Sequence, residues 1–347
     1  MDEMKQGYQK DIERVASLSL PWENLSGRNI LVTGATGLIG ACLVDVLMNR
    51  QNRDYDVYVA GRNEVRAKKL FAAFWNNPQF HFIQYDVMRP FQTNVAFHYI
   101  IHAASNASPN FFAATPVEVM KANLMGVCNL MDYGRQHDIC RFLYVSTGEV
   151  YGEGDGRVFS EDYSGYVNPM SPRSCYPSSK RAAETLCVSY ASEYSVDVVV
   201  ARLSHVYGPR FTESDNRVYA QFIRNVLRGE DIVLKSKGEQ FRSWCYVVDA
   251  VMGMLFVLLK GQMGEAYNVA DATSNISIRQ LAEMVAEIGG HKVIVDVPLE
   301  EEKKGYNPVT KSVFATNKLE SLGWAVTGSM KDKMISTIQE CKRYEVI

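Results

Sequence analysis

The sequence lacks a hydrophobic run long enough to cross a bilayer. Its longest apolar stretch, residues 250–259, is about half the length that a transmembrane helix requires. Residues 1–14 alternate acidic and basic side chains and contain no apolar segment behind a basic start, so no secretory signal is predicted. We therefore expect a cytoplasmic protein with no membrane partner.

An excess of charge of one sign is also absent. The 347 residues include 37 Lys and Arg against 39 Asp and Glu, which gives a formal net charge of -2. Binding to a nucleic-acid backbone normally needs a net basic face, so no nucleic-acid partner is expected. With 47% hydrophobic residues, the chain is long enough for one large or two medium domains with real cores.

Cysteine pairs with metal-ligand spacing are missing as well. The seven cysteines are odd in number and never form a CxxC motif, which indicates reduced thiols that pack as small hydrophobic side chains. His98 and His102 are four residues apart, but they lie in a β-branched, strand-like segment that no nearby cysteine or carboxylate completes. We therefore predict no metal site.

The hydrophobic pattern predicts strands that alternate with helices over the first two thirds of the chain. The expected strands are residues 29–33, 56–60, 80–85, 99–103, 142–146 and 196–202, and the first two helices are residues 38–48 and 64–74. Such alternation implies right-handed crossovers and an α/β, doubly wound parallel Rossmann sheet. After residue 204 the alternation loosens, which indicates a smaller C-terminal α+β lobe for the substrate.

These patterns divide the chain into three parts. Residues 1–27 are expected to form a polar helical extension. Residues 28–203 and 239–272 form the predicted dinucleotide-binding domain, and residues 204–238 and 273–347 form the smaller lobe.

A glycine-rich turn lies between the first strand and its helix. In Thr33-Gly-Ala-Thr-Gly-Leu-Ile-Gly40 the glycines permit a tight turn, close approach of a pyrophosphate and close packing of helix on strand. A tight βα turn without a ligand is the alternative, but the flanking strand and helix supply the context that dinucleotide binding requires. The predicted contacts are Gly34, Thr36, Gly37, Leu38, Ile39 and Gly40.

The residues after the second strand bear on which dinucleotide binds. An acidic residue there would accept the ribose hydroxyls of NAD, whereas this chain has Gly61-Arg62-Asn63. Arg62 can pair with a 2′-phosphate, unless it is simply a solvated side chain at a helix start. The sequence therefore favours NADP(H), with NAD(H) as the alternative and with Arg62 and Asn63 as cofactor contacts.

Tyr176-Pro-Ser-Ser-Lys180 places a phenol and an ammonium on one face of a predicted helix. An unperturbed phenol has a pKa near 10, and lowering that pKa by about three units takes roughly 4 kcal/mol. A neighbouring lysine and a positive nicotinamide ring are suitable perturbers. Tyr176 could then exchange a proton with a substrate oxygen while the cofactor exchanges a hydride at the same carbon. YxxxK also occurs by chance, but residues 146–152 at the end of the preceding strand make it specific.

These motifs resemble those of the extended branch of the short-chain dehydrogenase/reductase superfamily, which acts on nucleotide-activated sugars. The TGxxGxxG spacing, the length and the C-terminal lobe carry the resemblance. It implies that Thr147, or alternatively Ser146, hydrogen-bonds the reacting oxygen. It also implies homodimers formed through residues 116–133 and 178–194. The further cofactor contacts that it implies are Asp86, Val87, Ala103, Ala104 and Ser105.

Within that branch, residues 161–184, residues 216–218 and Arg242 resemble UDP-glucuronate decarboxylases most closely. The resemblance implies that Glu149 joins the catalytic set beside the sugar and that Arg242 holds the diphosphate. Arg217 would border the nucleotide, unless both arginines are surface charges. His205 could contact substrate, carry a proton or pack in the core. The predicted substrate contacts are Ser105, Asn106, Ser146, His205, Arg210, Arg217 and Arg242.

Three departures from the decarboxylase pattern favour a different reaction. Decarboxylases carry an acid after the second strand and retain NAD. They have a serine where this chain has Gly148, and the related 4,6-dehydratases have an aspartate there. His205 replaces the usual asparagine. We therefore predict an NADPH-dependent enzyme that reduces a keto group on a nucleotide-activated sugar, with an activated alditol as one product.

Other functions remain open at this point. They are a cofactor-recycling UDP-glucuronate decarboxylase, an epimerase, a 4,6-dehydratase and a non-catalytic cofactor-sensing scaffold. The nucleotide base could be uridine, thymidine or cytidine.

Overall fold

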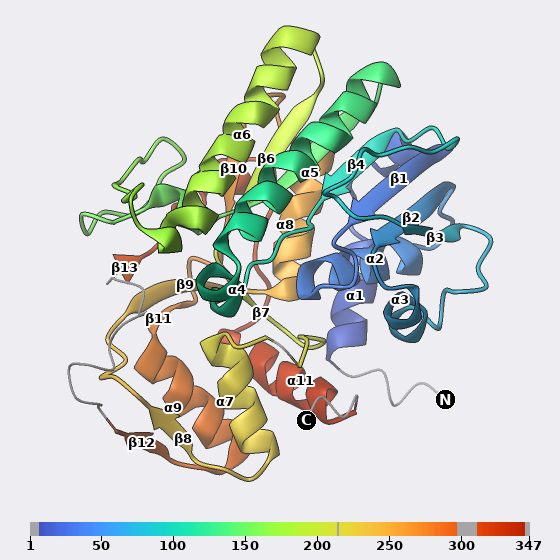
Figure 1. Ribbon diagram of the computed structural model, residues 1–347. Helices are drawn as coiled ribbons and strands as arrows, with labels where there is room; N and C mark the ends of the chain where they lie inside the picture. The colour runs from blue at the N-terminus through green and yellow to red at the C-terminus, as the bar shows by residue number, and fades with distance from the viewer. Residues whose placement is uncertain (1–6, 214, 297–310, 344–347) are drawn as a thin grey trace.

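The computed structural model describes residues 7–213, 215–296 and 311–343. Its main feature is a seven-stranded sheet in the order β10-β6-β5-β4-β1-β2-β3, in which every neighbouring pair is parallel (Figure 1). The predicted doubly wound parallel sheet is therefore confirmed. The strands are β1 (Arg28–Thr33), β2 (Tyr55–Gly61), β3 (Phe80–Gln84), β4 (Tyr99–His102), β5 (Arg141–Thr147), β6 (Val198–Leu203) and β10 (Ala266–Val269).

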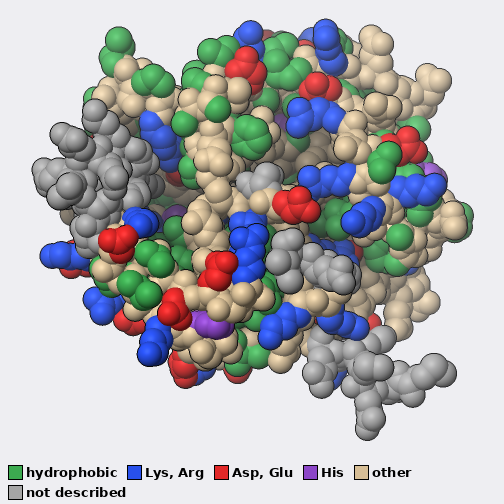
Figure 2. Space-filling view, turned by 60° about the horizontal axis from the view of Figure 1, so that its bottom comes forward, with side chains coloured by type: hydrophobic (Ala, Val, Ile, Leu, Met, Phe, Trp, Pro, Cys, Tyr) green, Lys and Arg blue, Asp and Glu red, His purple; other side chains and the backbone are tan. Residues whose placement is uncertain are grey.

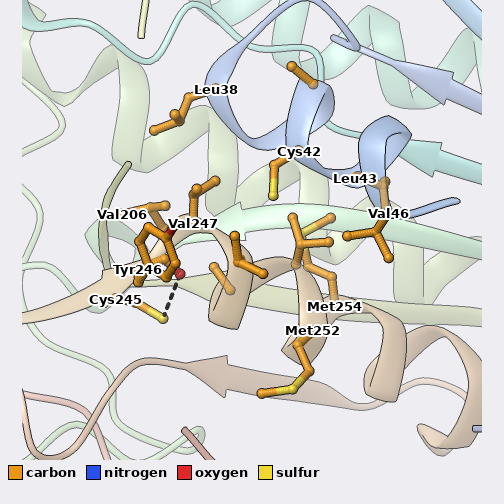
Figure 3. Close-up of a cluster of buried hydrophobic side chains, with 14 of the residues drawn as sticks. Leu38, Cys42, Leu43, Val46, Val206, Cys245, Tyr246, Val247, Met252 and Met254 are labelled. Carbon is orange, nitrogen blue, oxygen red and sulfur yellow. Dashed lines mark hydrogen bonds between the residues drawn. The ribbon is translucent and has the colours of Figure 1, made fainter. Parts of the chain in front are cut away.

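Helices cover both faces of this sheet, which explains why its strands are apolar throughout. One buried cluster joins the sheet to α1 (Tyr8–Ala16), α2 (Leu38–Asn49) and α8 (Val247–Lys260). Figure 3 shows this cluster where α2 approaches α8, with Leu43 and Val46 on one helix and Met254 on the other. A second cluster joins the opposite face to α5 (Pro116–Gln136) and α6 (Cys175–Tyr194).

A smaller lobe lies beyond the carboxyl ends of the main strands, at the bottom of Figure 1. In its sheet β9 (Phe241–Tyr246) pairs with β7 (His205–Tyr207), β11 (Asn275–Ser277) and β13 (Lys311–Ser312), and a separate pair joins β8 (Ile232–Leu234) to β12 (Val293–Val295). Its helices are α7 (Val218–Leu227), α9 (Ile278–Gly289) and α11 (Met330–Arg343). Basic and acidic side chains are interspersed over this side of the molecule (Figure 2).

Short elements complete the fold. They are α3 (Glu64–Leu70), α4 (Pro109–Ala114), α10 (Asn317–Glu320) and the 3-10 turns η1 (Trp22–Leu25), η2 (Gly148–Tyr151) and η3 (Pro172–Ser174). The helix predicted over residues 64–74 ends at Leu70. The turns that follow bring Phe71, Phe74 and Trp75 against the ring of Phe80, so aromatic packing replaces the last helical turn.

The N-terminal extension is tied to the rest of the chain by buried polar contacts. The hydroxyl of Tyr8 donates a 2.8 Å hydrogen bond to Asp45 of α2.

Across the described ranges, no helix combines the length and apolar character needed to span a membrane. Nor do three His, Cys, Asp or Glu side chains of residues 7–213, 215–296 and 311–343 come together as a metal site.

A buried ion pair fixes the C-terminal helix. Lys333 of α11 lies 2.7 Å from a carboxylate oxygen of Asp249 on α8, and the side chains are 6% and 0% exposed. Removing one partner of a buried pair leaves an uncompensated charge, which is strongly destabilising. The buried end of α11 therefore depends on this contact.

We expect Lys333→Met to lower the free energy of unfolding by about 3–5 kcal/mol, because the buried Asp249 and Asp271 would both lose the ammonium and only the more distant Arg14 would remain beside Asp249. Urea unfolding at pH 7 measures the change. The matched control is Lys331→Met on the same helix, whose exposed ion pair with Glu287 should contribute less than about 1 kcal/mol. Equal losses of unfolding free energy in the two variants would show that the buried ion pair contributes no more to stability than the exposed one.

Candidate active site

The glycine-rich turn after β1 brings two loops into close contact. Gly34 has a φ of +67°, and a Cβ on it would lie 2.5 Å from the carbonyl oxygen of Ala103. A Cβ on Gly40 would overlap the main chain of Gly34, so α2 packs directly on the turn. Both positions therefore require glycine.

The start of α2 suits an anion. The helix begins at Leu38, and its first turn contains no acidic side chain. Its N-cap, Gly37, has no side chain that could occupy the free N–H groups. Free donors and the helix dipole favour a negative group at such a position. The turn, which also contains Thr36 and Ile39, therefore fits the pyrophosphate of a dinucleotide.

Basic side chains follow β2 beside this turn. Arg62 is exposed, and Asn63 caps α3 by accepting a 2.9 Å hydrogen bond from the backbone N–H of Arg66. The Arg66 guanidinium donates to the carbonyl oxygen of Thr36 at 3.0 Å. The sequence analysis missed Arg66, although its place one turn after Arg62 on a basic helix was a usable signal. Two cations thus lie at the end of β2, and one of them contacts the glycine-rich turn.

The other predicted cofactor contacts follow β3 and β4. The Asp86 carboxylate accepts from the backbone of Met88 at 3.0 Å, and the carbonyl of Val87 accepts from Asn129 at 2.8 Å. The loop of Ala103, Ala104, Ser105 and Asn106 passes Gly34 and leads to α4. The Ser105 hydroxyl donates to Asn123 of α5 at 2.8 Å. The carboxyl ends of β1 to β4 therefore border one region, as expected at a switch in strand order.

Three of the predicted catalytic residues come together at the end of β5 and the start of α6. The hydroxyl of Thr147 lies close enough to the phenol of Tyr176 to lower the pKa of that phenol. Lys180 donates to the carbonyl of Val145 at 2.9 Å, and its Nζ lies 5.9 Å from the centre of the Tyr176 ring. Ser146 is 4% exposed, and within the described part of the chain its hydroxyl has no partner.

The protein groups around Tyr176 favour the protonated phenol. Burial and the carboxylate of Glu149 raise the pKa of Tyr176, while Thr147, Arg217 and Arg173 act in the opposite direction. Among the protein groups, desolvation outweighs the nearby cations, so the predicted lowering of this pKa depends on the positive nicotinamide ring. Burial also lowers the pKa of Lys180 to about 8. At neutral pH Tyr176 is a proton donor.

Glu149 is held beside this centre by an arginine. The Arg173 guanidinium lies 2.9 Å from a carboxylate oxygen of Glu149. The sequence analysis did not single out Arg173, although it lies three residues before Tyr176 in the segment that resembles decarboxylases. Between Thr147 and Glu149, a Cβ on Gly148 would overlap the ring of Phe314 from the segment after β13. The ring of Phe314 thus occupies the space that a side chain at position 148 would need.

The smaller lobe contributes a second group of cations. Arg217 makes hydrogen bonds of 2.9 and 3.1 Å to Asp215, and burial lowers the pKa of Arg242 to about 10. The imidazole of His205 lies 5.4 Å from the Trp244 ring. Burial, together with the charges of Arg242 and Arg217, lowers the pKa of His205 to about 3. His205 is therefore neutral at physiological pH.

Arg210 lies apart from these contacts. Its guanidinium is 2.8 Å from a carboxylate oxygen of Asp45, which also accepts the Tyr8 hydrogen bond. Its backbone adopts a φ of +67°. Arg210 has the least structural support among the predicted substrate-binding residues. Its ion pair with Asp45 joins the two lobes instead.

A parallel sheet with a glycine-rich βα turn, and with Thr147 beside a buried Tyr176 and Lys180, defines a dinucleotide-dependent enzyme. Comparison with known proteins agrees. The model of the NAD dependent epimerase/dehydratase family matches residues 30–270. UDP-glucuronic acid decarboxylase 6 of Arabidopsis thaliana is 36% identical over 299 residues, which cover 86% of this chain and 84% of that protein.

Solved structures show the same fold. UDP-glucose 4-epimerase from Thermotoga maritima, with UDP-glucose, superposes with a TM-score of 0.77 at 25% identity, over 91% of this chain and 99% of that one. UDP-glucuronic acid 4-epimerase from Bacillus cereus, in complex with UDP-glucuronic acid and NAD, gives 0.76 at 24% identity with the same coverage. The chain therefore belongs to the NAD dependent epimerase/dehydratase family, and its interpretation as an extended short-chain dehydrogenase/reductase is confirmed.

The buried Lys180 predicts a pH-dependent stability. Its pKa is about 8 in the folded chain against an ordinary value of 10.5, so between these values the unfolded chain binds more protons and stability rises with pH. Relative to Lys180→Met, we expect the wild type to gain roughly 3 kcal/mol of unfolding free energy as pH rises through this window. Urea unfolding at pH 7 and pH 10 measures the gain. The exposed Lys69→Met is the control. If the difference in unfolding free energy between the wild type and Lys180→Met does not change with pH, the prediction is contradicted.

Proposed function

We propose that the chain is an NADPH-dependent reductase of a keto group on a nucleotide-activated sugar, with an open-chain ketose reduced to an activated alditol as one form of the reaction. The observation that carries the proposal is the contact between Gly148 and Phe314. It leaves no room beside Thr147 for an acid or base at position 148. Proton transfer at the oxygen held by Thr147 therefore falls to Tyr176.

The chemistry follows from these side chains. When bound, the dinucleotide supplies the hydride. The hydroxyls of Thr147 and Tyr176 donate hydrogen bonds to the carbonyl oxygen, and the proton of Tyr176 passes to that oxygen as it gains negative charge. The ammonium of Lys180 stabilises the phenolate that remains. One hydride and one proton convert the carbonyl to an alcohol, so the reaction balances.

The part of the substrate that the cations of the smaller lobe would bind is a nucleoside diphosphate. Arg217 and Arg242 both act electrostatically on His205, so two cations approach one imidazole. Guanidinium groups bind phosphate oxygens bidentately. Nδ1 of His205 has no hydrogen-bond partner among the residues that the structure describes, and a neutral imidazole nitrogen can accept from a sugar hydroxyl. Ser105, Asn106 and Ser146 complete the proposed sugar contacts.

A cofactor-recycling UDP-glucuronate decarboxylase is the second candidate. The 36% identity to a plant enzyme with that name favours it, as does the placement of Glu149 and Arg242. Such an enzyme would release carbon dioxide with no net consumption of dinucleotide. The two candidates therefore differ in a quantity that can be measured directly.

The test incubates the purified protein with NADPH and keto-sugar derivatives of UDP, dTDP and CDP. We expect loss of absorbance at 340 nm in a one-to-one ratio with reduced product. Tyr176→Phe should lower the rate about 100-fold or more, because the proton donor is lost. NADPH affinity should stay within about twofold, a difference below 1 kcal/mol.

The exposed Tyr166→Phe is the control for the loss of a phenol hydroxyl elsewhere. In a parallel incubation with UDP-glucuronic acid and NAD, release of carbon dioxide without net change in absorbance at 340 nm would assign the decarboxylase reaction instead. NADPH binding without turnover of any sugar, unaffected by Tyr176→Phe, would point to a non-catalytic, cofactor-sensing protein.

Cofactor choice is proposed to rest on Arg62, with Arg66 holding the adjacent turn. We expect Arg62→Ala to raise the Kd for NADPH about tenfold or more, which corresponds to about 1.4 kcal/mol, because a phosphate contact is lost. The Kd for NADH should not change. Fluorescence titration measures both constants, and the exposed Lys69→Ala on α3 is the control. Equal weakening of the two dinucleotides would remove Arg62 from the 2′-phosphate site.

We also propose a cytoplasmic homodimer formed through α5 and α6. These helices pack against each other, yet both also expose apolar side chains. The exposed residues are Val117, Met120 and Met125 on α5 and Val188 and Tyr194 on α6. Apolar side chains that line neighbouring helices suit a self-complementary interface.

A further inference from the structure

The phenol of Tyr176 is covered by an aromatic ring from another element. Phe112 of α4 stacks on Tyr176 with ring centres 4.5 Å apart and an angle of 19° between the planes. Both residues are buried, with exposures of 2% and 6%. The Phe112 ring also lies 4.7 Å from the guanidinium carbon of Arg173, which pairs with Glu149. Phe112 therefore contacts the tyrosine itself and the arginine that holds the nearby carboxylate.

The helix that carries Phe112 is too short to be stable alone. It spans Pro109–Ala114, and its N-cap residue, Ser108, makes no capping hydrogen bond. The Ser108 hydroxyl instead donates a 2.6 Å hydrogen bond to the amide oxygen of Asn216 in the smaller lobe. The Ser108 side chain thus makes a hydrogen bond to a residue 108 positions later in the chain instead of capping its own helix. Tertiary structure therefore holds α4 in place.

We propose that Phe112 is a positioning residue for Tyr176 and that the Ser108–Asn216 hydrogen bond couples its placement to the smaller lobe. Asn216 directly precedes Arg217, a proposed nucleotide contact. The segment that meets the substrate's nucleotide therefore also anchors the helix whose ring orients the phenol. This inference rests on the proposed role of Tyr176 as the proton donor.

The stack restricts the Tyr176 ring in two ways. The stacked ring hinders flipping about the Cβ–Cγ bond, which leaves the phenol oxygen on the rotation axis, and it hinders rotation about the Cα–Cβ bond, which would displace that oxygen. It also keeps water from the covered face. Without it, the phenol would sample orientations in which its oxygen is displaced from the reacting carbonyl. Small displacements of a reacting group reduce rates strongly while substrate binding is retained.

The experiment compares Phe112→Leu with Phe111→Leu, a neighbouring phenylalanine of α4 that is 40% exposed. In protein with ¹³C-labelled tyrosine rings, assigned with Tyr176→Phe, we expect faster flipping of the Tyr176 ring in Phe112→Leu only. With NADPH and a keto-sugar substrate, kcat of Phe112→Leu should fall about tenfold or more with KM little changed. Phe112→Tyr should restore both quantities, and Ser108→Ala should shift them in the same direction by less.

The outcomes separate this inference from the proposed function. Identical ring flipping in the wild type and in Phe112→Leu overturns the positioning role, and so does equal behaviour of Phe111→Leu and Phe112→Leu. If Phe112→Leu does not fold, Phe112→Tyr and Ser108→Ala decide the question through the same two measurements. If no sugar nucleotide is reduced, the proposed function fails, but the ring-flip measurement still decides whether Phe112 fixes Tyr176.

Discussion

The approach of the Thr147 hydroxyl to the Tyr176 phenol is the contact on which the chemistry of this site depends. It joins the last residue of β5, a central strand, to the first turn of α6, so its geometry is set by the core that packs α6 on the sheet. A separate buried cluster of Phe112, Val119, Cys175 and Tyr176 removes water from the phenol. Desolvation keeps the proton on Tyr176.

The two lobes make different contributions to this point. The parallel sheet supplies the glycine-rich turn and the buried Tyr176 and Lys180, all on rigid elements. The smaller lobe supplies Arg217 and Arg242, and it inserts Phe314 against Gly148. Because these contacts come from segments far apart in the chain, the complete site exists only when both lobes are in place. This dependence explains why a ring as large as Phe314 can define the chemistry of a glycine more than 160 residues before it.

The sequence predicted the parts of the structure that depend on local pattern. The strands, the turn around Gly34 and the spacing of Tyr176 and Lys180 are readable because each follows from periodicity or from a short motif. The contacts of Arg173, Phe112 and Phe314 were not readable in this way, since each depends on a tertiary neighbour. The protonation of Tyr176 could not be predicted for the same reason. A motif shows that a lysine is near, but it does not show how completely both groups are buried.

Protonation also bears on the direction of the reaction. The protein groups leave Tyr176 protonated and lower the pKa of Lys180 to about 8. The phenol therefore carries a proton that it can donate. A reduced nicotinamide adds no charge beside this phenol, whereas an oxidised one would add a positive charge and lower its pKa. The resting state of Tyr176 therefore matches the reduced dinucleotide. Since Gly148 offers no second acid, this protonation supports the proposed delivery of one hydride and one proton to a single carbonyl group.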